Sequence, residues 1–331
     1  MNNLKKLSMA LTVVGLGAAA SFADVKVNDN LSLKGFLDMS MAGTMPKTGP
    51  GTATASFDQF ETDFLFKTGS HITAEADIAQ GGLGGGPGGA GAIALESGWI
   101  TYSDSASGLS FSTGRFLSVS GFEAAEPTAT YQYSYNEGIG SYGVYENGVN
   151  VAYNGGMFTL YGALVSSVWN GGGDVDIKRF GGEAQLGLMP TKEITVKVTN
   201  LAEQQVGYMK DVVNGWASYS MGSLLDAVEG DYLMNYAAKK DNGYGAMAMV
   251  NYKITPKISA TGRFSTIHTK LGLQPGVVPA TAIAGSVAGT AQEITVSPCY
   301  SIADNWWVLG EARYELKAKS TALGMETTFT F

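Results

Sequence analysis

The dominant feature of this sequence is an alternation of apolar and polar side chains with a period of two residues, repeated along the chain with turn residues between the repeats. In segment 31–41, leucine and methionine alternate with serine, lysine and aspartate. In segment 321–331, apolar side chains alternate with glycine, glutamate and threonine. Successive side chains of a β-strand point to opposite faces. The pattern therefore predicts an all-β, antiparallel chain whose strands have one apolar and one polar face.

A soluble β-sandwich and a transmembrane barrel both alternate in this way, and the aromatic side chains separate the two. They gather at the ends of the predicted strands, where a barrel places its interfacial girdles, at Tyr102, Tyr153, Trp169, Tyr252 and Trp306. After residue 23, no apolar run approaches the roughly 20 residues that a spanning helix needs. A membrane chain without helical spans pairs its backbone groups in a closed barrel. We therefore predict a transmembrane antiparallel β-barrel over residues 24–331.

Residues 1–23 are predicted to be a cleaved signal peptide. Lys5 and Lys6 precede an apolar run over 7–20, and Ser21-Phe22-Ala23 fits the small-x-small cleavage rule. A run of about 14 apolar residues is too short to span a membrane. The predicted location is the bacterial outer membrane. The terminal Phe331 resembles the assembly signal of outer-membrane barrels, so outer-membrane lipids and the barrel-assembly machinery are predicted partners.

The alternation predicts about sixteen strands, since both ends of such barrels lie in the periplasm and the number should be even. Their bounds are 31–42, 57–68, 71–80, 92–103, 108–116, 142–153, 157–168, 175–188, 192–200, 210–221, 231–239, 243–253, 257–268, 290–301, 304–316 and 321–331. Short turns are expected at 69–70, 104–107, 154–156, 189–191, 254–256 and 303–304. Longer outer segments are expected at 43–56, 81–91, 117–141 and 269–289. Segment 201–230 alternates poorly, which leaves fourteen or eighteen strands open.

A barrel of this size encloses an aqueous channel, whereas eight strands leave room for side chains only. The residues predicted to line the channel lie on the polar strand faces and are Asp38, Glu61, Asp63, Glu75, Asp77, Arg179, Arg263, Glu311, Arg313 and Glu315. Acids outnumber bases on these faces, so we expect a mild preference for cations. The formal net charge of −8 and the absence of a basic stripe argue against nucleic acid as a partner.

Residues 114–136 read GRFLSVSGFEAAEPTATYQYSYN, directly after a predicted strand. This run resembles the signature stretch of the OmpL-like β-barrel porin-2 family. Similarity to that family also extends to the segments Leu33-Lys34-Gly35-Phe36-Leu37-Asp38 and 57–66 and to the aromatic C-terminus. Between 201 and 290, only Asn214-Gly215-Trp216 resembles the family. The resemblance implies an outer-membrane porin through which small hydrophilic solutes diffuse passively.

The segment 117–141 follows the fifth predicted strand. By analogy with sixteen-stranded general porins, this loop folds into the barrel and narrows it. Its residues Glu123, Glu126, Tyr131 and Tyr133 are therefore the predicted pore constriction. The two glutamates would face wall bases such as Arg179, Arg263 or Arg313. The alternative is a loop packed at the rim with its acids in solvent.

Two other function classes stay open at this point. One is a structural or adhesive barrel plugged by its own loops, for which the alanine-rich stretch Val277 to Ala291 is a candidate plug. The other is a barrel hydrolase built on clustered acids, although acids on neighbouring strands of a wet lumen are more often channel lining. We predict a channel rather than an enzyme.

Several residues that could indicate other chemistry have simpler interpretations. Gly84, Gly86 and Gly89 satisfy G-x-G-x-x-G, but the run around Pro87 does not begin a helix well, so a loop is favoured over a dinucleotide site. His71 and His268 lie on distant strands without neighbouring ligands, so no metal and no cofactor are predicted. The lone Cys299 is interpreted as a small strand residue. The sequence leaves open whether the chain forms a homo-oligomer.

Overall fold

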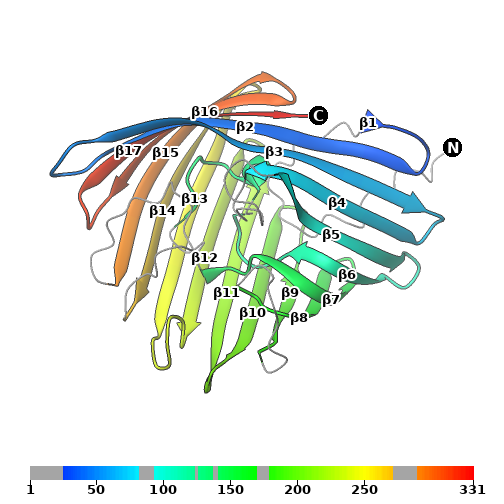
Figure 1. Cartoon of the computed structure of the whole chain (residues 1–331). Coiled ribbons are helices and arrows are strands. Elements are labelled where there is room, and N and C mark those ends of the chain that lie inside the picture. Colours follow the sequence, from blue (N-terminus) through cyan, green and yellow to red (C-terminus); the bar gives the residue numbers. More distant parts are fainter. Residues whose placement is uncertain (1–24, 82–92, 124–125, 137–140, 170–178, 271–288) are drawn as a thin grey trace.

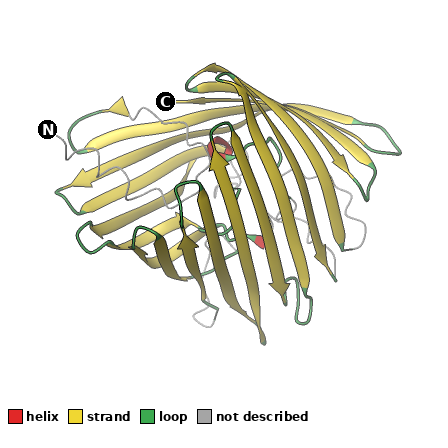
Figure 2. Ribbon diagram, turned by 180° about the vertical axis from the view of Figure 1, so that it is seen from behind, coloured by secondary structure: helices red, strands yellow, loops and turns green. Residues whose placement is uncertain are grey.

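The computed structural model describes residues 25–81, 93–123, 126–136, 141–169, 179–270 and 289–331. In this part of the chain, seventeen strands form one antiparallel sheet (Figures 1 and 2). Strand β17 (Ser320–Thr330) pairs with β2 (Leu31–Met45), so strands β2 to β17 close into a sixteen-stranded barrel. The two-residue strand β1 (Val25–Lys26) pairs with the start of β2. The predicted all-β barrel of sixteen strands is confirmed.

The other strands follow one another around the barrel in sequence order. Their bounds are β3 (Thr52–Thr68), β4 (Ile72–Gly81), β5 (Ile93–Asp104), β6 (Leu109–Leu117), β7 (Tyr145–Asn154), β8 (Phe158–Val165), β9 (Gly181–Leu188), β10 (Ile194–Gln205), β11 (Tyr208–Met221), β12 (Leu224–Met234), β13 (Gly243–Thr255), β14 (Ile258–Thr269), β15 (Thr290–Ala303) and β16 (Trp306–Glu315). A 3-10 turn, η1 (Pro127–Ala129), lies between β6 and β7. Within the described residues, no helix has the length and apolarity needed to cross a membrane.

One end of the barrel carries only short connections, and we call it the short-turn end. Its turns lie at 69–71, 105–108, 155–157, 189–193, 222–223, 256–257 and 304–305. All six short turns expected from the sequence are found there. The turn at 222–223 was missed. The segment that joins β6 to β7, residues 118–144, belongs to the opposite end.

Segment 201–230 holds the main correction to the predicted strands. The predicted strand 231–239 is wrong, because β12 spans Leu224–Met234 and residues 235–242 form a turn at the end of the barrel opposite the short-turn end. Strand β12 directs Leu225, Ala227 and Leu233 into the barrel, where they are buried. Since the outward residues Val228 and Tyr232 are apolar too, both faces of the strand are largely apolar and the sequence loses its alternation.

Two further differences concern strand ends, and some predictions lie outside the described residues. Strands β2 and β3 extend beyond the expected bounds and leave only residues 46–51 between them. A β-bulge at Asp58 shifts the register there. Strand β9 begins at Gly181, later than predicted. The predicted signal peptide, the glycine motif at 84–89 and most of the stretch 277–291 lie outside the described residues.

The outer face of the barrel is apolar and the inner face is mostly polar. Outward side chains such as Met41 and Ile100 are each 56% exposed in the isolated chain. The inward Asp38 and Glu61 are only 3% and 5% exposed. An outer surface of this kind suits the hydrocarbon core of a membrane. The inward polar face, which lies on the lumen side, needs water or polar partners.

Candidate functional site

The candidate site is the segment between β6 and β7, residues 118–144, which we call the inner loop. Its described residues, 118–123, 126–136 and 141–144, lie inside the barrel (Figure 1). Its first part contacts strands on the far wall: the backbone N–H of Gly121 donates to Asn214 of β11 at 3.1 Å, and that of Phe122 donates to Glu229 of β12 at 2.6 Å. These contacts hold the start of the loop against the inner wall of the barrel.

The start of the inner loop is folded tightly on its own end. Gly121 has a φ of +83°, and a Cβ atom there would lie 2.4 Å from the ring of Tyr142. Only glycine combines that backbone conformation with so close an approach. The hydroxyl of Tyr142 donates to Glu229 and accepts from the amide of Asn136 at 2.9 Å. The two ends of the loop are thus held together on β12.

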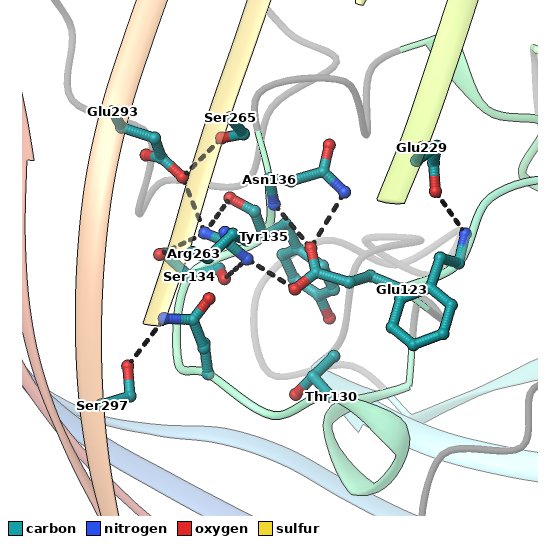
Figure 3. Close-up of polar contacts among 12 residues, drawn as sticks. Glu123, Thr130, Ser134, Tyr135, Asn136, Glu229, Arg263, Ser265, Glu293 and Ser297 are labelled. Carbon is teal, nitrogen blue, oxygen red and sulfur yellow. Dashed lines mark hydrogen bonds and ion pairs between the residues drawn. The ribbon is translucent and has the colours of Figure 1, made fainter. Parts of the chain in front are cut away.

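Arg263 of β14 is the main polar anchor of the inner loop (Figure 3). Its Nη1 contacts Glu123 Oε1 at 2.6 Å and donates to the backbone carbonyl of Ser134 at 2.8 Å. Its Nη2 contacts Glu293 Oε1 of β15 at 2.7 Å and donates to the carbonyl of Tyr135 at 3.0 Å. The side chains of Arg263, Glu123 and Glu293 are at most 1% exposed. One guanidinium therefore joins both arms of the loop to the wall.

The carboxylates around Arg263 have further partners. Glu123 Oε2 accepts from the backbone N–H and the side-chain amide of Asn136, at 2.8 and 2.9 Å. Glu293 Oε2 lies 3.5 Å from Nη1 of Arg313 on β16. The two acids and two bases of this group offset one another at a buried position, which is the condition under which buried ions are tolerated, and Glu311 of β16 is a further buried carboxylate near Arg263.

Beyond Arg263, the inner loop continues along the wall to β2. The amide of Gln132 donates to Ser297 Oγ of β15 at 3.0 Å, and the backbone N–H of Ser134 donates to Glu311 Oε2 of β16 at 3.0 Å. The hydroxyls of Tyr133 and Ser40 of β2 are 3.1 Å apart. The loop therefore crosses the lumen from β6 and β7 and is fixed to the wall between β11 and β2.

Apolar contacts support the same placement. Phe122 meets the Trp216 ring edge to face, with centroids 5.3 Å apart and planes at 78°. These two residues form a buried cluster with Leu225, Ala227, Met247 and Met249, against which Tyr131 packs. Burial of such side chains is the main source of folding free energy. The inner faces of β11 to β13 thus carry an apolar surface on which the inner loop packs, and we call this surface the seat of the inner loop.

The inner faces of β3, β4 and β5 differ from that seat because they carry a group of carboxylates, which we call the acidic wall. Its members are Glu61, Asp63, Glu75, Asp77 and Glu96. Lys34 of β2 contacts Asp63 at 3.4 Å and Glu75 at 3.0 Å. The amide of Gln59 donates to Glu61 at 2.7 Å and to Glu96 at 3.0 Å. Arg115 of β6 donates from Nε to the backbone carbonyl of Glu96 at 2.6 Å.

Glu126 is an inner-loop residue whose carboxyl group interacts electrostatically with Glu96 and Asp63 of the acidic wall. Its Oε1 accepts from the hydroxyl of Tyr145 of β7 at 2.6 Å, and its Oε2 is buried without a hydrogen-bond partner. Burial raises the pKa of Glu126 to about 7, and the negative charge of Glu96 acts in the same direction. The carboxyl group of Glu126 therefore changes charge near neutral pH.

The predicted constriction residues have different surroundings. Glu123 is 2% exposed and bound to Arg263, whereas Glu126 lies toward the acidic wall. Tyr131 is partly buried at the apolar cluster, and Tyr133 packs on Gly324 of β17, where a Cβ atom would lie 2.6 Å from the Tyr133 ring. Their role in narrowing the pore stays a prediction.

The structure places most of the predicted lining residues on the inner face of the barrel, and their role as pore lining stays a prediction. Asp38, Glu311 and Glu315 are buried on the inner face, and Glu315 accepts backbone N–H groups of Gln292 and Lys317. Arg179 is exposed and precedes β9, because the strand does not reach back to it. It therefore does not face Glu123, and Arg263 takes that position.

Sequence reasoning missed several residues that hold the inner loop. Asn214 and Glu229 lie in the segment whose alternation is obscured, so their inward direction could not be assigned. Glu293 shows the right alternation but nothing that reveals its contact with Arg263. Ser134 and Asn136 lie in the loop, where no periodic pattern applies.

The acids of the acidic wall lie close enough to hold a cation. Ligand oxygens of Asp63, Glu75 and Asp77 lie within 4.8 Å of one another. The ammonium of Lys34 already contacts two of these carboxylates. The two histidines are apart, with His71 stacked on Tyr102 and His268 bound to Thr290.

Comparisons with known proteins agree with this architecture. The family model described as "Putative beta-barrel porin-2, OmpL-like" matches residues 58–330. Among solved structures, OmpF of Salmonella typhi in complex with daunomycin is 12% identical, with a TM-score of 0.65 over 92% of this chain and 99% of that chain. The trimer form of Vibrio cholerae OmpT is also 12% identical, with a TM-score of 0.59 over 91% and 99%. An anion-selective porin from Comamonas acidovorans is 11% identical, with a TM-score of 0.62 over 91% and 99%. No curated protein matches the chain.

Proposed function

We propose that this chain, which belongs to the β-barrel porin-2 (OmpL-like) family and is a porin of the bacterial outer membrane, lets small hydrophilic solutes and ions diffuse passively with a mild preference for cations. The proposed path runs through the lumen past the inner loop. In this arrangement the short-turn end faces the periplasm, as is usual for such barrels.

The acidic wall is the observation that carries the cation preference. Its carboxylates lie on three adjacent strands, and the bases beside them are Lys34 and Arg115. Across the lumen, the charges of Glu123, Glu293, Arg263 and Arg313 compensate one another. The uncompensated potential is therefore negative, which raises the local concentration of cations.

The inner loop is proposed to set the width of the pore. Its attachment to Arg263 and to the apolar seat holds it away from the rim, and Glu126 and the acidic wall then border the remaining passage. In this proposal, Glu123 narrows the pore by fixing the loop, whereas Glu126 contributes charge.

Planar-bilayer recording tests the function. We expect steps of conductance in KCl and a reversal potential across a KCl gradient that favours K⁺. The double variant Glu61→Gln with Asp77→Asn should shift that potential toward zero. Asp304→Asn, in an exposed short turn, is the matched control and should leave it unchanged. Anion preference of the natural protein would reject the proposed selectivity.

A plugged barrel with a structural or adhesive role is the second candidate. It is favoured by a cluster of buried apolar residues near the strand ends opposite the short-turn end. This cluster includes Leu201, Val212, Leu233 and Ile267. A folded protein that is silent in bilayers would support this role and exclude the pore. We propose no enzymatic activity, since the clustered acids are bound to Lys34, Gln59 and Ser97.

The oligomeric state is proposed by analogy alone. The trimer form of Vibrio cholerae OmpT shares this fold, so a homo-oligomer is the expected assembly. Crosslinking in native membranes tests it, and a monomer alone would contradict it.

A further inference from the structure

A cavity of about 250 Å³ lies at the short-turn end, between the inner loop and the wall of β10 to β13. Its lining combines hydroxyl groups, an amide, lysines and a tyrosine, among them Tyr131, Lys192, Thr195, Ser218, Asn251 and Lys253. A solute that had passed the inner loop would meet this cavity next.

The wall of the cavity carries hydroxyl and amide groups on adjacent strands. Thr195 of β10 is directly opposite Ser218 of β11, and Asn251 of β13 lies next along the wall beyond Leu225. Thr195, Ser218 and Asn251 are 6%, 8% and 6% exposed, so their positions are fixed by the sheet. The hydroxyl groups both donate and accept hydrogen bonds, as the hydroxyl groups of a polyol require. The amide of Asn251 donates to Thr261 Oγ1 at 2.8 Å, so Asn251 offers its carbonyl oxygen as an acceptor.

Tyr131 and Leu225 provide the apolar part of the cavity. Tyr131 is the residue of the inner loop that reaches it, and it packs against the cluster that contains Leu225. A flat aromatic ring beside a row of polar groups suits a solute with one C–H face and one hydroxyl face.

The charge at the mouth of the cavity is positive. Lys192 is paired with Glu193 at 3.6 Å. Lys253 is exposed at the end of β13 and makes no ion pair within the described residues. One lysine is therefore available for an anionic group, in contrast to the acidic wall on the other side of the barrel.

We propose that this cavity is a solute-binding subsite for a small polyhydroxylated carboxylate, such as a sugar acid. Its volume is below the roughly 300–1,000 Å³ of sites for drug-sized ligands, so a single small solute fits. Lys253 binds the carboxylate, the hydroxyl row binds the polyol chain, and Tyr131 covers it. This inference rests on the proposed pore function and adds a preferred solute class to it.

The experiment is block of single-channel current in constant KCl by solutes added at the short-turn end. Gluconate is compared with sorbitol, which lacks the carboxylate, with acetate, which lacks the polyol, and with inorganic phosphate. We expect gluconate to block at a concentration at least about tenfold lower than any of the other three. Equal block by all four solutes, or phosphate block as strong as that of gluconate, would overturn the proposal.

Variants connect the block to the cavity. Lys253→Gln should raise the half-blocking concentration of gluconate about fivefold, because a partly exposed charge makes a modest contribution. Ser218→Ala should raise the half-blocking concentrations of gluconate and sorbitol by the same factor. Lys257→Gln, at an exposed turn outside the cavity, is the control and should change nothing. Unchanged block in Lys253→Gln would contradict the subsite.

Failure of this inference and failure of the pore are distinguishable. Conductance steps in KCl without selective gluconate block would reject the subsite and keep the pore, whereas absence of steps would reject both. Heat-dependent mobility on gels shows whether each variant is folded. Because Lys253 is exposed, its variant is expected to fold even if Ser218→Ala does not.

Discussion

The acidic wall on β3 to β5 and the seat of the inner loop on β11 to β13 share the same strand geometry but face the lumen with opposite chemistry. On the acidic wall, inward carboxylates such as Asp77 alternate with outward apolar residues. On the seat, the inward residues include Trp216, Leu225 and Met247, while outward residues are apolar as well. The difference shows that the inner face is apolar where Phe122 and Tyr131 of the inner loop pack on it, and carries carboxylates where they do not.

This comparison also separates two kinds of ionic group. The ion pairs around Arg263 fix a segment of chain and are buried to 1% exposure or less. Lys34 of the acidic wall is 28% exposed and contacts two acids. We therefore expect substitutions on the loop side to affect stability and pore width, and those on the acidic wall to affect ion preference.

The largest effect is expected from Arg263→Met. This change leaves Glu123 and Glu293 buried without their cation, and breaking a buried pair costs about 3–5 kcal/mol. We expect the inner loop to detach and single-channel conductance to rise, with a lower unfolding temperature in detergent. The triple variant that adds Glu123→Gln and Glu293→Gln should recover part of the stability. Unchanged conductance in folded Arg263→Met would contradict the proposal that the attachment of the inner loop to Arg263 sets the width of the pore.

A smaller effect is expected from Phe122→Ala. Loss of the aromatic contact with Trp216 should cost about 2–3 kcal/mol, somewhat less than in a closed core, because the loop can partly collapse into the space. Phe57→Ala, on the outer face of β3, is the control with the same chemical change, and Phe57 is 49% exposed in the isolated chain. Urea unfolding in detergent measures both. Equal losses of unfolding free energy in the two variants would mean that the contact of Phe122 with the seat adds no stability beyond that of an outward phenylalanine.

The smallest effect is expected from titration of Glu126. Its pKa is raised to about 7 from a usual value of 4.5, so between these values the folded state binds more protons than the unfolded state, and stability falls as pH rises through this window. Above pH 7, the added negative charge should raise the cation-to-anion permeability ratio by less than about twofold.

Reversal potentials at pH 6 and pH 8 measure the effect of Glu126, with Glu126→Gln as the comparison. The charged and titratable groups around Glu126 are present in both proteins, so the difference between the two isolates Glu126. They are Lys34, Glu61, Asp63, Glu96, Tyr135 and Tyr145. An identical pH response in Glu126→Gln would contradict its place beside the passage.

The sequence alone determined the class of fold and most strand positions, because period-two alternation is a local property of each strand. It also identified the inner loop and directed Asp38, Glu61 and Arg263 inward, since their positions follow from strand parity. The same logic failed at β12, where Leu225 and Ala227 face the loop instead of water. Local alternation cannot show this, since it depends on which distant segment covers the strand.

Only the tertiary structure decided which charges meet. The contact of Glu123 with Arg263 joins residues that are 140 positions apart, and nothing in either local pattern selects that pair over Arg179 or Arg313. The partner is set by closure of the barrel and by the path of the inner loop through it, which brings β14 opposite the loop. Sequence pattern fixes the direction of a side chain, whereas its electrostatic partner depends on the distance between elements, which only the closed sheet determines.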